Sequence, residues 1–374
     1  MKILFTGGGT GGHFYPIIAV AEEVRQLAIE QKLIGVNLYF ASIDKYNERL
    51  LFENDIKFVG VIAGKVRRYS SIANFFDGFK TFFGVILALW KLYFIYPDVV
   101  FGKGGFASFP MLIAARIFGI PVVIHESDSH PGRVNLWAKK FATRIAVSYP
   151  EALNYFPADK TALTGNPLRK EIISPIYQGA HESLKLDQNV PTIFITGGSQ
   201  GAQPINEAVL TILPELVADF QVIHQVGTAN FAETNTRAGV ILSNSEHKNR
   251  YRLYDYLNDT ALRMTAGVVG LIVSRAGSTI FEIAHWGIPS IIIPLPESIS
   301  HDQTTNAFTY AKSGGAVVIE QTNLTPSVLL SEIRRVMADR NLQQTMSQKA
   351  KEFSRPDAAR LIAKELINIS LSHE

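Results

Sequence analysis

Three glycine-rich turns carry the residues best suited to hold an anion. They read GGGTGGH at residues 7–13, GKGGF at residues 102–106 and GGSQG at residues 197–201. Glycine permits positive φ and lets backbone N–H groups approach a ligand, and a helix that begins in such a turn adds the positive end of its dipole. We therefore predict phosphate binding at these turns. A tight strand-to-helix turn that binds nothing is the alternative.

The first turn also matches the dinucleotide fingerprint, at Gly7, Gly9 and Gly12. That fingerprint places an acidic residue roughly 20 positions later, at the end of the second strand, to bind the ribose. The second predicted strand instead ends in FAS at residues 40–42. A nicotinamide-dependent oxidoreductase would therefore account for the first turn only, and would leave the glycine-rich second half of the chain unexplained.

The second half adds a run of small hydroxyl residues, SRAGSTIFE at residues 274–282. Ser278 and Thr279, at the start of a predicted helix, suit a diphosphate, and Glu282 one turn further suits the two hydroxyls of a ribose. An ordinary capped helix, with Glu282 in the capping role, is the alternative. Further on, Asp302 and Gln303 begin another helix, where they suit sugar hydroxyls and serve equally well as N-caps.

The residues give little support to metal or cofactor chemistry. The segment HESDSH at residues 125–130 spaces its histidines five apart, whereas the helical zinc motif needs them four apart. The chain has no cysteine, no Walker A lysine and no nucleophile elbow. We therefore expect no metal and no cofactor, and we assign the neutralisation of phosphate charge to backbone N–H groups, helix ends and arginines such as Arg169.

Short apolar strands alternate with longer helical patterns through both halves of the chain, which predicts parallel sheets covered by helices on both faces. The helix after residue 13 shows the periodicity most clearly, with Ile17, Val20, Val24 and Leu27 on one face. The predicted strands of the first half are Lys2–Thr6, Asn37–Ala41, Phe58–Ile62, Asp98–Phe101, Pro121–Ile124 and Arg144–Val147. Those of the second half are Thr192–Thr196, Gln221–His224, Leu271–Ser274, Ser290–Ile293 and Ala316–Ile319.

The alternation stops between Thr164 and Pro191, where polar residues and prolines collect. Two units that each open with a strand, a glycine turn and a helix predict two Rossmann-like, doubly wound α/β domains, whose turns line one cleft if the domains face each other. We place the first domain at residues 1–165 and the second at residues 166–355. The tail, residues 356–374, is expected to form one amphipathic helix that packs back on the first domain.

Bulk composition fits two packed domains. The 374 residues are 47% hydrophobic and carry a net charge of +3, which gives no support to a nucleic-acid-binding protein. The N-terminal run MKILF is too short for a signal peptide, so we expect it to form the first strand. Between Thr81 and Tyr96 an apolar stretch is interrupted by Lys91 and falls short of the roughly 20 residues of a membrane span. We expect that stretch not to cross a membrane.

Five motifs, and their order along the chain, resemble those of the MurG family of bacterial N-acetylglucosaminyltransferases. Members of this family have the GT-B fold of two Rossmann-like domains facing across a cleft. The motifs are GGTGGH at 8–13, HE at 125–126, GNP at 165–167 with Arg169, GGSQG at 197–201 and the run from Arg275 to Glu282. The resemblance covers nearly the whole chain. It implies transfer of N-acetylglucosamine from UDP to the muramyl-pentapeptide on undecaprenyl diphosphate (lipid I), with inversion and without a metal, to give lipid II for peptidoglycan synthesis.

The resemblance also implies roles for individual residues. His13, or a group near it, would deprotonate the acceptor hydroxyl, and Arg169 and Ser199 would face the donor diphosphate or nucleoside, with the backbone near Leu257 at the uracil. The residues assigned to the acceptor diphosphate are Gly8, Gly9, Gly104 and Gly105. The residues assigned to UDP-N-acetylglucosamine are Thr10, Gly11, Gly12, Asp128, Arg169, Ser199, Leu257, Ser278, Thr279, Glu282, Asp302 and Gln303.

Two positions depart from the family pattern. Asp128 stands where the family pattern has an asparagine, so this contact becomes an acceptor-only carboxylate when ionised. Asp302 precedes Gln303 where some members have a pair of glutamines. Both changes are compatible with the substrate class and bear on the fine specificity for the sugar.

A lipid-linked acceptor requires the enzyme to reach a membrane surface. The segment around the apolar stretch mixes basic and aromatic side chains, which suits contact with anionic lipid; a core helix with a basic rim is the alternative. These residues are Lys65, Arg67, Arg68, Phe75, Phe76, Phe79, Lys80, Phe82 and Phe83. The resemblance implies a peripheral protein at the cytoplasmic face of the cell membrane, with a role in cell shape and division and with cell-wall synthesis proteins as further partners.

Another GT-B glycosyltransferase that acts on a lipid acceptor is one alternative, and two further classes compete with the transferase. A UDP-sugar epimerase of the same fold would use the donor residues without an acceptor. A non-catalytic scaffold at the membrane surface would keep the apolar helix but would have no use for Ser278, Thr279, Glu282, Asp302 and Gln303 together.

Overall fold

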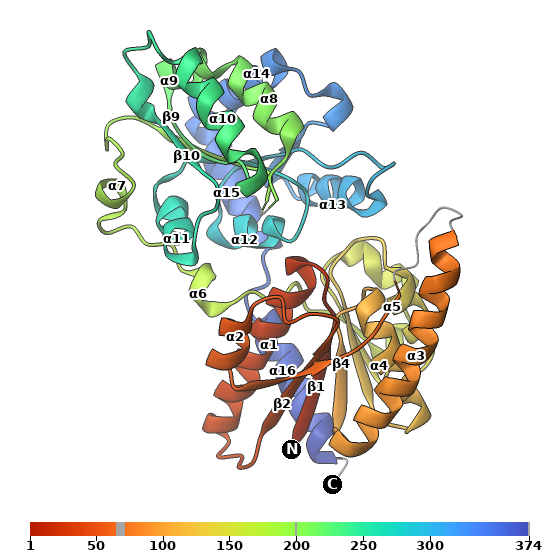
Figure 1. The fold of residues 1–374 in the computed structure, drawn as a ribbon. Coiled ribbons are helices and arrows are strands. Elements are labelled where there is room, and N and C mark those ends of the chain that lie inside the picture. The colour runs from red at the N-terminus through yellow and green to blue at the C-terminus, as the bar shows by residue number, and fades with distance from the viewer. Residues whose placement is uncertain (65–71, 199, 373–374) are drawn as a thin grey trace. The chain divides into compact units, whose positions relative to one another are not determined.

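The computed structural model describes residues 1–64, 72–198 and 200–372, which form two compact α/β domains (Figure 1). The first domain comprises Met1–Arg169 and Arg355–Glu374, and the second comprises Lys170–Ser354. The chain therefore leaves the first domain once and returns to it with its last helix. Several residues named above lie outside the description, wholly or in their side chains: Lys65, Arg67, Arg68, Phe75, Phe76 and Ser199.

The first domain is built on a seven-stranded parallel sheet. The strands are β1 (Lys2–Thr6), β2 (Asn37–Ser42), β3 (Ile56–Gly60), β4 (Val99–Gly102), β5 (Val122–Glu126), β6 (Arg144–Val147) and β7 (Thr161–Leu163). Their spatial order is β3-β2-β1-β4-β5-β6-β7, so the winding reverses between β1 and β4. A ligand site in such a sheet lies at the carboxyl ends of the strands beside that reversal.

Helices cover both faces of this sheet (Figure 1). They are α1 (Gly11–Glu30), α2 (Glu48–Glu53), α3 (Ile72–Ile95), α4 (Phe109–Ile117), α5 (Arg133–Ala138) and α16 (Ala358–Ser372). Ile3 and Phe5 of β1 join the core formed with α1 and α16, whereas Leu4 joins the core formed with α3 and α4. The alternation follows from the two-residue period of a strand, whose successive side chains point to opposite faces.

The last helix, α16, packs along α1 in the first domain (Figure 1). Its apolar stripe includes Ala363 and Leu366, which are completely buried. At its solvent side, Arg360 pairs with Glu23 and Glu30 of α1. The helix is therefore fixed by apolar burial on one side and by ion pairs on the other.

The second domain repeats the design on a six-stranded parallel sheet of order β10-β9-β8-β11-β12-β13, with its reversal between β8 and β11. The strands are β8 (Thr192–Thr196), β9 (Gln221–Gln225), β10 (Tyr251–Tyr254), β11 (Leu271–Ser274), β12 (Ser290–Ile292) and β13 (Ala316–Val318). The helices are α6 (Lys170–Ile173), α7 (Ala180–Ser183), α8 (Gln203–Thr211), α9 (Leu213–Asp219), α10 (Thr228–Ile241), α11 (Asp259–Val268), α12 (Thr279–Trp286), α13 (His301–Lys312), α14 (Pro326–Ala338) and α15 (Arg340–Phe353).

Every predicted strand overlaps an observed one, but β7 and β10 are additional. Both are edge strands, and their short sequences TAL and YRLY are not fully buried, so they lack the continuous apolar run by which the other strands are recognised. The predicted strand Phe58–Ile62 is wrong by two residues at each end, because the pairing with β2 begins at Ile56 and ends at Gly60.

Helix α3 begins at Ile72, well before the apolar stretch that the sequence analysis placed between Thr81 and Tyr96. Its segment Asp77–Ile95 has 19 residues and a mean hydropathy of 1.4, and only 17% of it is buried. By length and composition alone this segment is able to cross a membrane, so the expectation that it is too short is wrong. In the structure one side of α3 packs on α4, and the Lys91 ammonium donates a hydrogen bond to the Gly60 carbonyl.

We expect Leu366→Ala to destabilise the first domain by about 2–5 kcal/mol, because it leaves a cavity between α16 and α1. Leu361→Ala on the same helix is the matched control: its side chain is 53% exposed, whereas Leu366 is 0% exposed. Urea unfolding followed by circular dichroism measures both. Equal effects of the two substitutions would contradict the packing described for α16.

Candidate active site

The first and second glycine turns meet at the carboxyl ends of β1 and β4. The Lys103 N–H, directly after β4, donates to the Thr6 carbonyl at the end of β1 (2.9 Å). Gly105 has a φ of +76°, and a Cβ built on it would lie 3.4 Å from Cε1 of His13. The turn after β4 therefore packs directly against the first turn of α1, and a side chain at Gly105 would be both strained and crowded.

His13 lies in the first turn of α1 with a half-buried side chain. Its Nδ1 is 2.9 Å from Oγ1 of Thr10, the residue that precedes the helix. Burial, and then the positive charge of Lys103, hold the pKa of His13 well below its ordinary value of 6.5. The imidazole is therefore neutral near pH 7, which is the form that accepts a proton.

Beside these turns, β5 ends in a pair of buried side chains. His125 Nε2 donates to the Gly165 carbonyl (3.0 Å) and lies 3.2 Å from Ser148 Oγ. These contacts join the ends of β5 and β6 and the segment after β7, so the buried imidazole has a structural use. Burial first, and then Lys103, lower the pKa of His125, which keeps the imidazole neutral.

Glu126 is held by three donors. Oε1 accepts from the Asp128 N–H (3.0 Å), and Oε2 accepts from the Gly132 N–H (3.0 Å) and from Asn135 Nδ2 (2.9 Å). Burial, and then the neighbouring Asp128, raise the pKa of Glu126 to about 7, although the three hydrogen bonds favour the carboxylate. Glu126 thereby fixes the loop between β5 and α5 on which Asp128 lies.

In the second domain, Gln225 at the end of β9 organises the third glycine turn. Its Nε2 donates to Thr196 Oγ1 (3.3 Å) and to the Gly198 carbonyl (3.2 Å), and its Oε1 accepts from the Leu257 N–H (3.0 Å). The Leu257 N–H is therefore occupied, and the uracil contact stays a prediction for the other backbone groups near Leu257.

The turn after β11 contains polar side chains of two kinds: one that makes hydrogen bonds within the domain, and two that lie at the start of a helix, where they could bind a ligand. Arg275 is buried and donates to the Ile293 and Pro294 carbonyls and to Gln321 Oε1, so it braces the end of β12. Ser278 precedes α12, and among the described residues its side chain makes no capping hydrogen bond. Ser278 and Thr279 are half-buried at the amino end of this helix, where the dipole favours an anion.

Helix α13 places Asp302 and Gln303 in its first turn. Gln303 Oε1 accepts from the Leu295 N–H (3.2 Å), and Thr304 Oγ1 donates to the Leu295 carbonyl (3.3 Å). These two bonds fix the segment after β12 against α13. Asp302 is half-buried beside them.

The predicted site residues fall into two groups, one on each domain. The group on the first domain comprises Gly8, Gly9, Thr10, Gly11, Gly12, His13, Gly104, Gly105, Asp128 and Arg169. The group on the second comprises Leu257, Ser278, Thr279, Glu282, Asp302 and Gln303, and Ser199 lies outside the described residues.

Arg169 differs from its expected place. The sequence boundary assigns it to the second domain, but in the structure it belongs to the first, with its guanidinium 4.4 Å from the centre of the Tyr15 ring. The side chain is buried, so it stacks on α1 through a cation–π contact. Its role at the donor diphosphate stays a prediction.

Sequence reasoning missed three residues that build the site: Lys103, Asn135 and Gln225. Lys103 lies inside the glycine turn at residues 102–106, and this position could have identified it from the sequence as a site residue. Asn135 acts through partners at least 9 positions away and Gln225 through partners at least 27 positions away, and nothing in their local sequence marks them.

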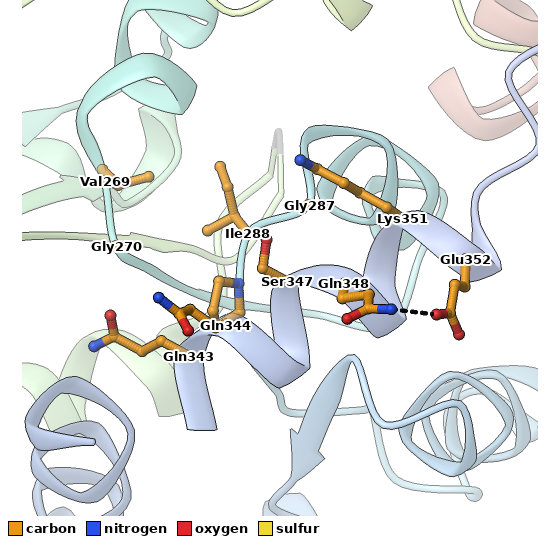
Figure 2. Close-up of a pocket in the computed structure, with 11 residues that line it drawn as sticks. Val269, Gly270, Gly287, Ile288, Gln343, Gln344, Ser347, Gln348, Lys351 and Glu352 are labelled. Atoms are coloured by element: carbon orange, nitrogen blue, oxygen red, sulfur yellow. Dashed lines mark hydrogen bonds between the residues drawn. The ribbon is translucent and has the colours of Figure 1, made fainter. Parts of the chain in front are cut away.

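Two surface grooves lie at the opposite edge of the sheets. The larger, of 750 Å³, is lined by residues 269–270 before β11, residues 287–289 before β12 and one side of α15, where Gln348 bonds Glu352 (Figure 2). The smaller, of 520 Å³, includes Pro121 and Thr143, which precede β5 and β6. Both lie at the amino ends of strands, away from the glycine turns, so neither belongs to the candidate site.

Comparisons with known proteins agree with this architecture. The glycosyltransferase family 28 N-terminal domain matches residues 3–147, and the family 28 C-terminal domain matches residues 192–362. A relative from Clostridium botulinum strain Hall, named UDP-N-acetylglucosamine--N-acetylmuramyl-(pentapeptide) pyrophosphoryl-undecaprenol N-acetylglucosamine transferase, is 34% identical over 94% of this chain and 95% of its own length. A relative of the same name from Clostridium perfringens is 36% identical over 91% of each chain.

Solved structures give the same result. The crystal structure of Acinetobacter baumannii MurG matches with a TM-score of 0.73 and 26% identity, over 98% of this chain and 99% of that one. Two Rossmann-like domains with glycine turns at the carboxyl ends of their strands define a GT-B protein, which confirms the predicted fold class. The chain belongs to glycosyltransferase family 28, and the resemblance to MurG is confirmed.

We expect Gly201→Ala to destabilise the second domain by more than about 1 kcal/mol, since Gly201 has a φ of +76° and an added Cβ would clash with the Val226 carbonyl. Gly239→Ala is the matched control: this glycine lies in α10 with nothing within 4 Å of an added Cβ, and alanine there should stabilise by up to about 1 kcal/mol. Thermal unfolding measures both, and a neutral Gly201→Ala would show that the turn does not require glycine.

Proposed function

We propose that this protein transfers N-acetylglucosamine from UDP-N-acetylglucosamine to the muramyl-pentapeptide of lipid I, giving lipid II for peptidoglycan synthesis. The observation that carries the proposal is the match over 94% of the chain to relatives named for this transfer. The two groups of site residues support it, because each lies where an open parallel sheet binds its ligand.

The donor half of the proposal rests on the second domain. The amino end of α12, with the hydroxyls of Ser278 and Thr279, suits the UDP diphosphate, and Glu282 in the first turn suits the ribose. Asp302 and Gln303 at the start of α13 would bind the sugar hydroxyls. Protein dipoles and arginines would thus carry the leaving-group charge without a metal.

The acceptor half rests on the first domain. Gly8, Gly9, Gly104 and Gly105 would hold the acceptor diphosphate by their N–H groups, and His13 between them would take the proton of the attacking hydroxyl. The hydroxyl attacks the anomeric carbon as the bond to UDP breaks, which inverts the configuration at that carbon.

We also propose that α3 brings the first domain to the cytoplasmic face of the cell membrane. Ala88 and Leu92 on one side of the helix are buried against the domain, while the other side exposes a set of large apolar residues. These are Phe79, Phe82, Phe83, Ile86, Trp90, Tyr93 and Phe94. This exposed apolar surface, with Lys80 at its edge, supports peripheral contact with anionic lipid. A role in cell shape and division would follow from the reaction, and cell-wall synthesis proteins are proposed as partners from the resemblance alone.

A UDP-sugar epimerase is the second candidate, because the crystal structure of UDP-GlcNAc 2-epimerase from Neisseria meningitidis bound to UDP-GlcNAc has the same fold, with a TM-score of 0.68 at 14% identity. Incubation with UDP-N-acetylglucosamine, with and without lipid I, separates the two. The proposal expects lipid II and free UDP only when lipid I is present. Conversion of the sugar nucleotide to an epimer without lipid I would replace it.

We expect His13→Ala to lower kcat by about 10²–10⁴-fold with little change in the Kd of UDP-N-acetylglucosamine, because it removes a proton acceptor and no donor contact. His181→Ala, on α7 of the second domain, is the control and should keep wild-type turnover. Wild-type turnover by His13→Ala would place the base elsewhere.

The pH profile should follow from the lowered pKa of His13. A base works in its neutral form, so activity is present above its pKa and is lost as the pH falls through it. The wild-type kcat should therefore remain high at pH 6.5, the ordinary pKa of histidine, and decline only at lower pH.

We expect replacement of both Phe82 and Phe83 by aspartate to weaken binding to anionic vesicles by at least roughly 100-fold, since burial of each phenylalanine in lipid would contribute roughly 1.5–3 kcal/mol. Phe52→Asp is the control, because this side chain on α2 is 87% exposed but lies on another helix. Vesicle co-sedimentation measures the binding. Equal losses for α3 and α2 variants would remove α3 as the contact surface.

A further inference from the structure

Lys103 is a buried cation beside the first glycine turn. It follows β4, and its side chain is only 1% exposed. Its Nζ has no hydrogen-bond partner among the described residues. An ammonium group that is removed from water and makes no hydrogen bond costs several kcal/mol unless opposite charges lie near it.

Two carboxylates supply that opposite charge. Glu126 and Asp128, at and just after the end of β5, both favour the charged form of Lys103, although burial lowers the pKa of its ammonium to about 8. The Asp128 N–H bonds Glu126 Oε1, so the two acidic residues are held on one short loop. The loop thus brings two carboxyl groups close enough to Lys103 to interact with its charge.

The turn that carries Lys103 contacts the first glycine turn, Asn135 and His13. An added Cβ on Gly7 would lie 3.0 Å from Lys103 Cβ, and one on Gly104 would lie 2.9 Å from Asn135 Nδ2, which bonds Glu126. Gly105 packs on the His13 ring. Lys103 is therefore positioned between the candidate base and the carboxylate loop.

We infer that Lys103 is a positioning residue for the transfer reaction: its buried ammonium group balances the carboxylates of Glu126 and Asp128 and keeps the His13 imidazole uncharged, ready to take the acceptor proton. The statement that His13 takes the acceptor proton rests on the proposed function. An imidazolium at His13 would face the Lys103 ammonium, and like charges at close range disfavour each other.

The charged and titratable groups around His13 come from three elements. Thr10, which precedes α1, and Tyr15 on α1 are its neighbours in the chain, with Arg169 stacked on Tyr15. Lys103 comes from the turn after β4, and His125, Glu126 and Asp128 come from the end of β5. Without Lys103, no cation would disfavour an imidazolium at His13, and the carboxyl groups of the loop after β5 would lose the charge that balances them. The pKa of His13 would rise, and the base would be protonated at a higher pH.

The test compares wild type with Lys103→Met, Asp128→Asn and the double variant Lys103→Met/Asp128→Asn. Lys103→Met should move the acidic limb of the kcat profile to higher pH by about one pH unit. At a pH on that limb, kcat should fall about tenfold relative to wild type, and it should recover at higher pH. The double variant has the same net charge as wild type, so its limb should move back toward the wild-type position. In Lys103→Met alone, which removes no residue assigned to the donor, KM for UDP-N-acetylglucosamine should not change.

A second readout needs no enzymatic activity. The His13 Cε1–H resonance, assigned by its loss in His13→Gln, is titrated by NMR without substrate, and it should titrate at higher pH in Lys103→Met than in wild type. If wild type makes no lipid II, the proposed function fails while this titration still decides the electrostatic role. Unchanged titration of His13 in a folded Lys103→Met protein would overturn the inference.

Folding of the variants is checked by thermal unfolding. If Lys103→Met does not fold, the double variant is compared with Asp128→Asn instead. These two proteins also differ only at residue 103, so the difference in the pH at which His13 titrates again reports the effect of Lys103. If neither protein with methionine folds while Lys103→Arg does, Lys103 has a structural role only, and the inference is overturned.

Discussion

Parallel strand pairing is the constraint on which both halves of the candidate site depend. Parallel strands bring all their carboxyl ends to one edge, and the reversal of winding between β1 and β4, and again between β8 and β11, leaves a gap there between diverging helices. The chain fills each gap with glycine turns. Residues separated by more than a hundred positions, such as His13 and Glu126, thereby share one small volume of the first domain.

That geometry explains why the turns contain so much glycine. At Gly105 and Gly201 the backbone has positive φ, and an added Cβ would approach a histidine ring in one case and a backbone carbonyl in the other. The glycines therefore serve packing between turns as well as access for a ligand. A tight turn and an anion site make the same demand on the backbone, which is why glycine content alone did not distinguish the two readings.

The sequence predicted the sheets and the turns because both depend on local patterns. Continuous apolar runs identified the central strands, and the glycine motifs identified the strand ends. The edge strands β7 and β10 were not predicted. They are not fully buried, so their sequences need no continuous apolar run. Arg169 and Leu257 show the same limit at the site: stacking on Tyr15 and the bond to Gln225 arise from tertiary contacts that no local pattern encodes.

The buried charges of the first domain give a physical meaning to Asp128, which departs from the family pattern. A second carboxylate beside Glu126 would raise the free energy of the loop if nothing opposed it, because two negative groups at close range repel and the buried Glu126 has lost its water. Lys103 offers the opposing charge from the turn after β4. The aspartate and the lysine are then two parts of one electrostatic arrangement, so substitution of either alone should disturb His13 more than substitution of both.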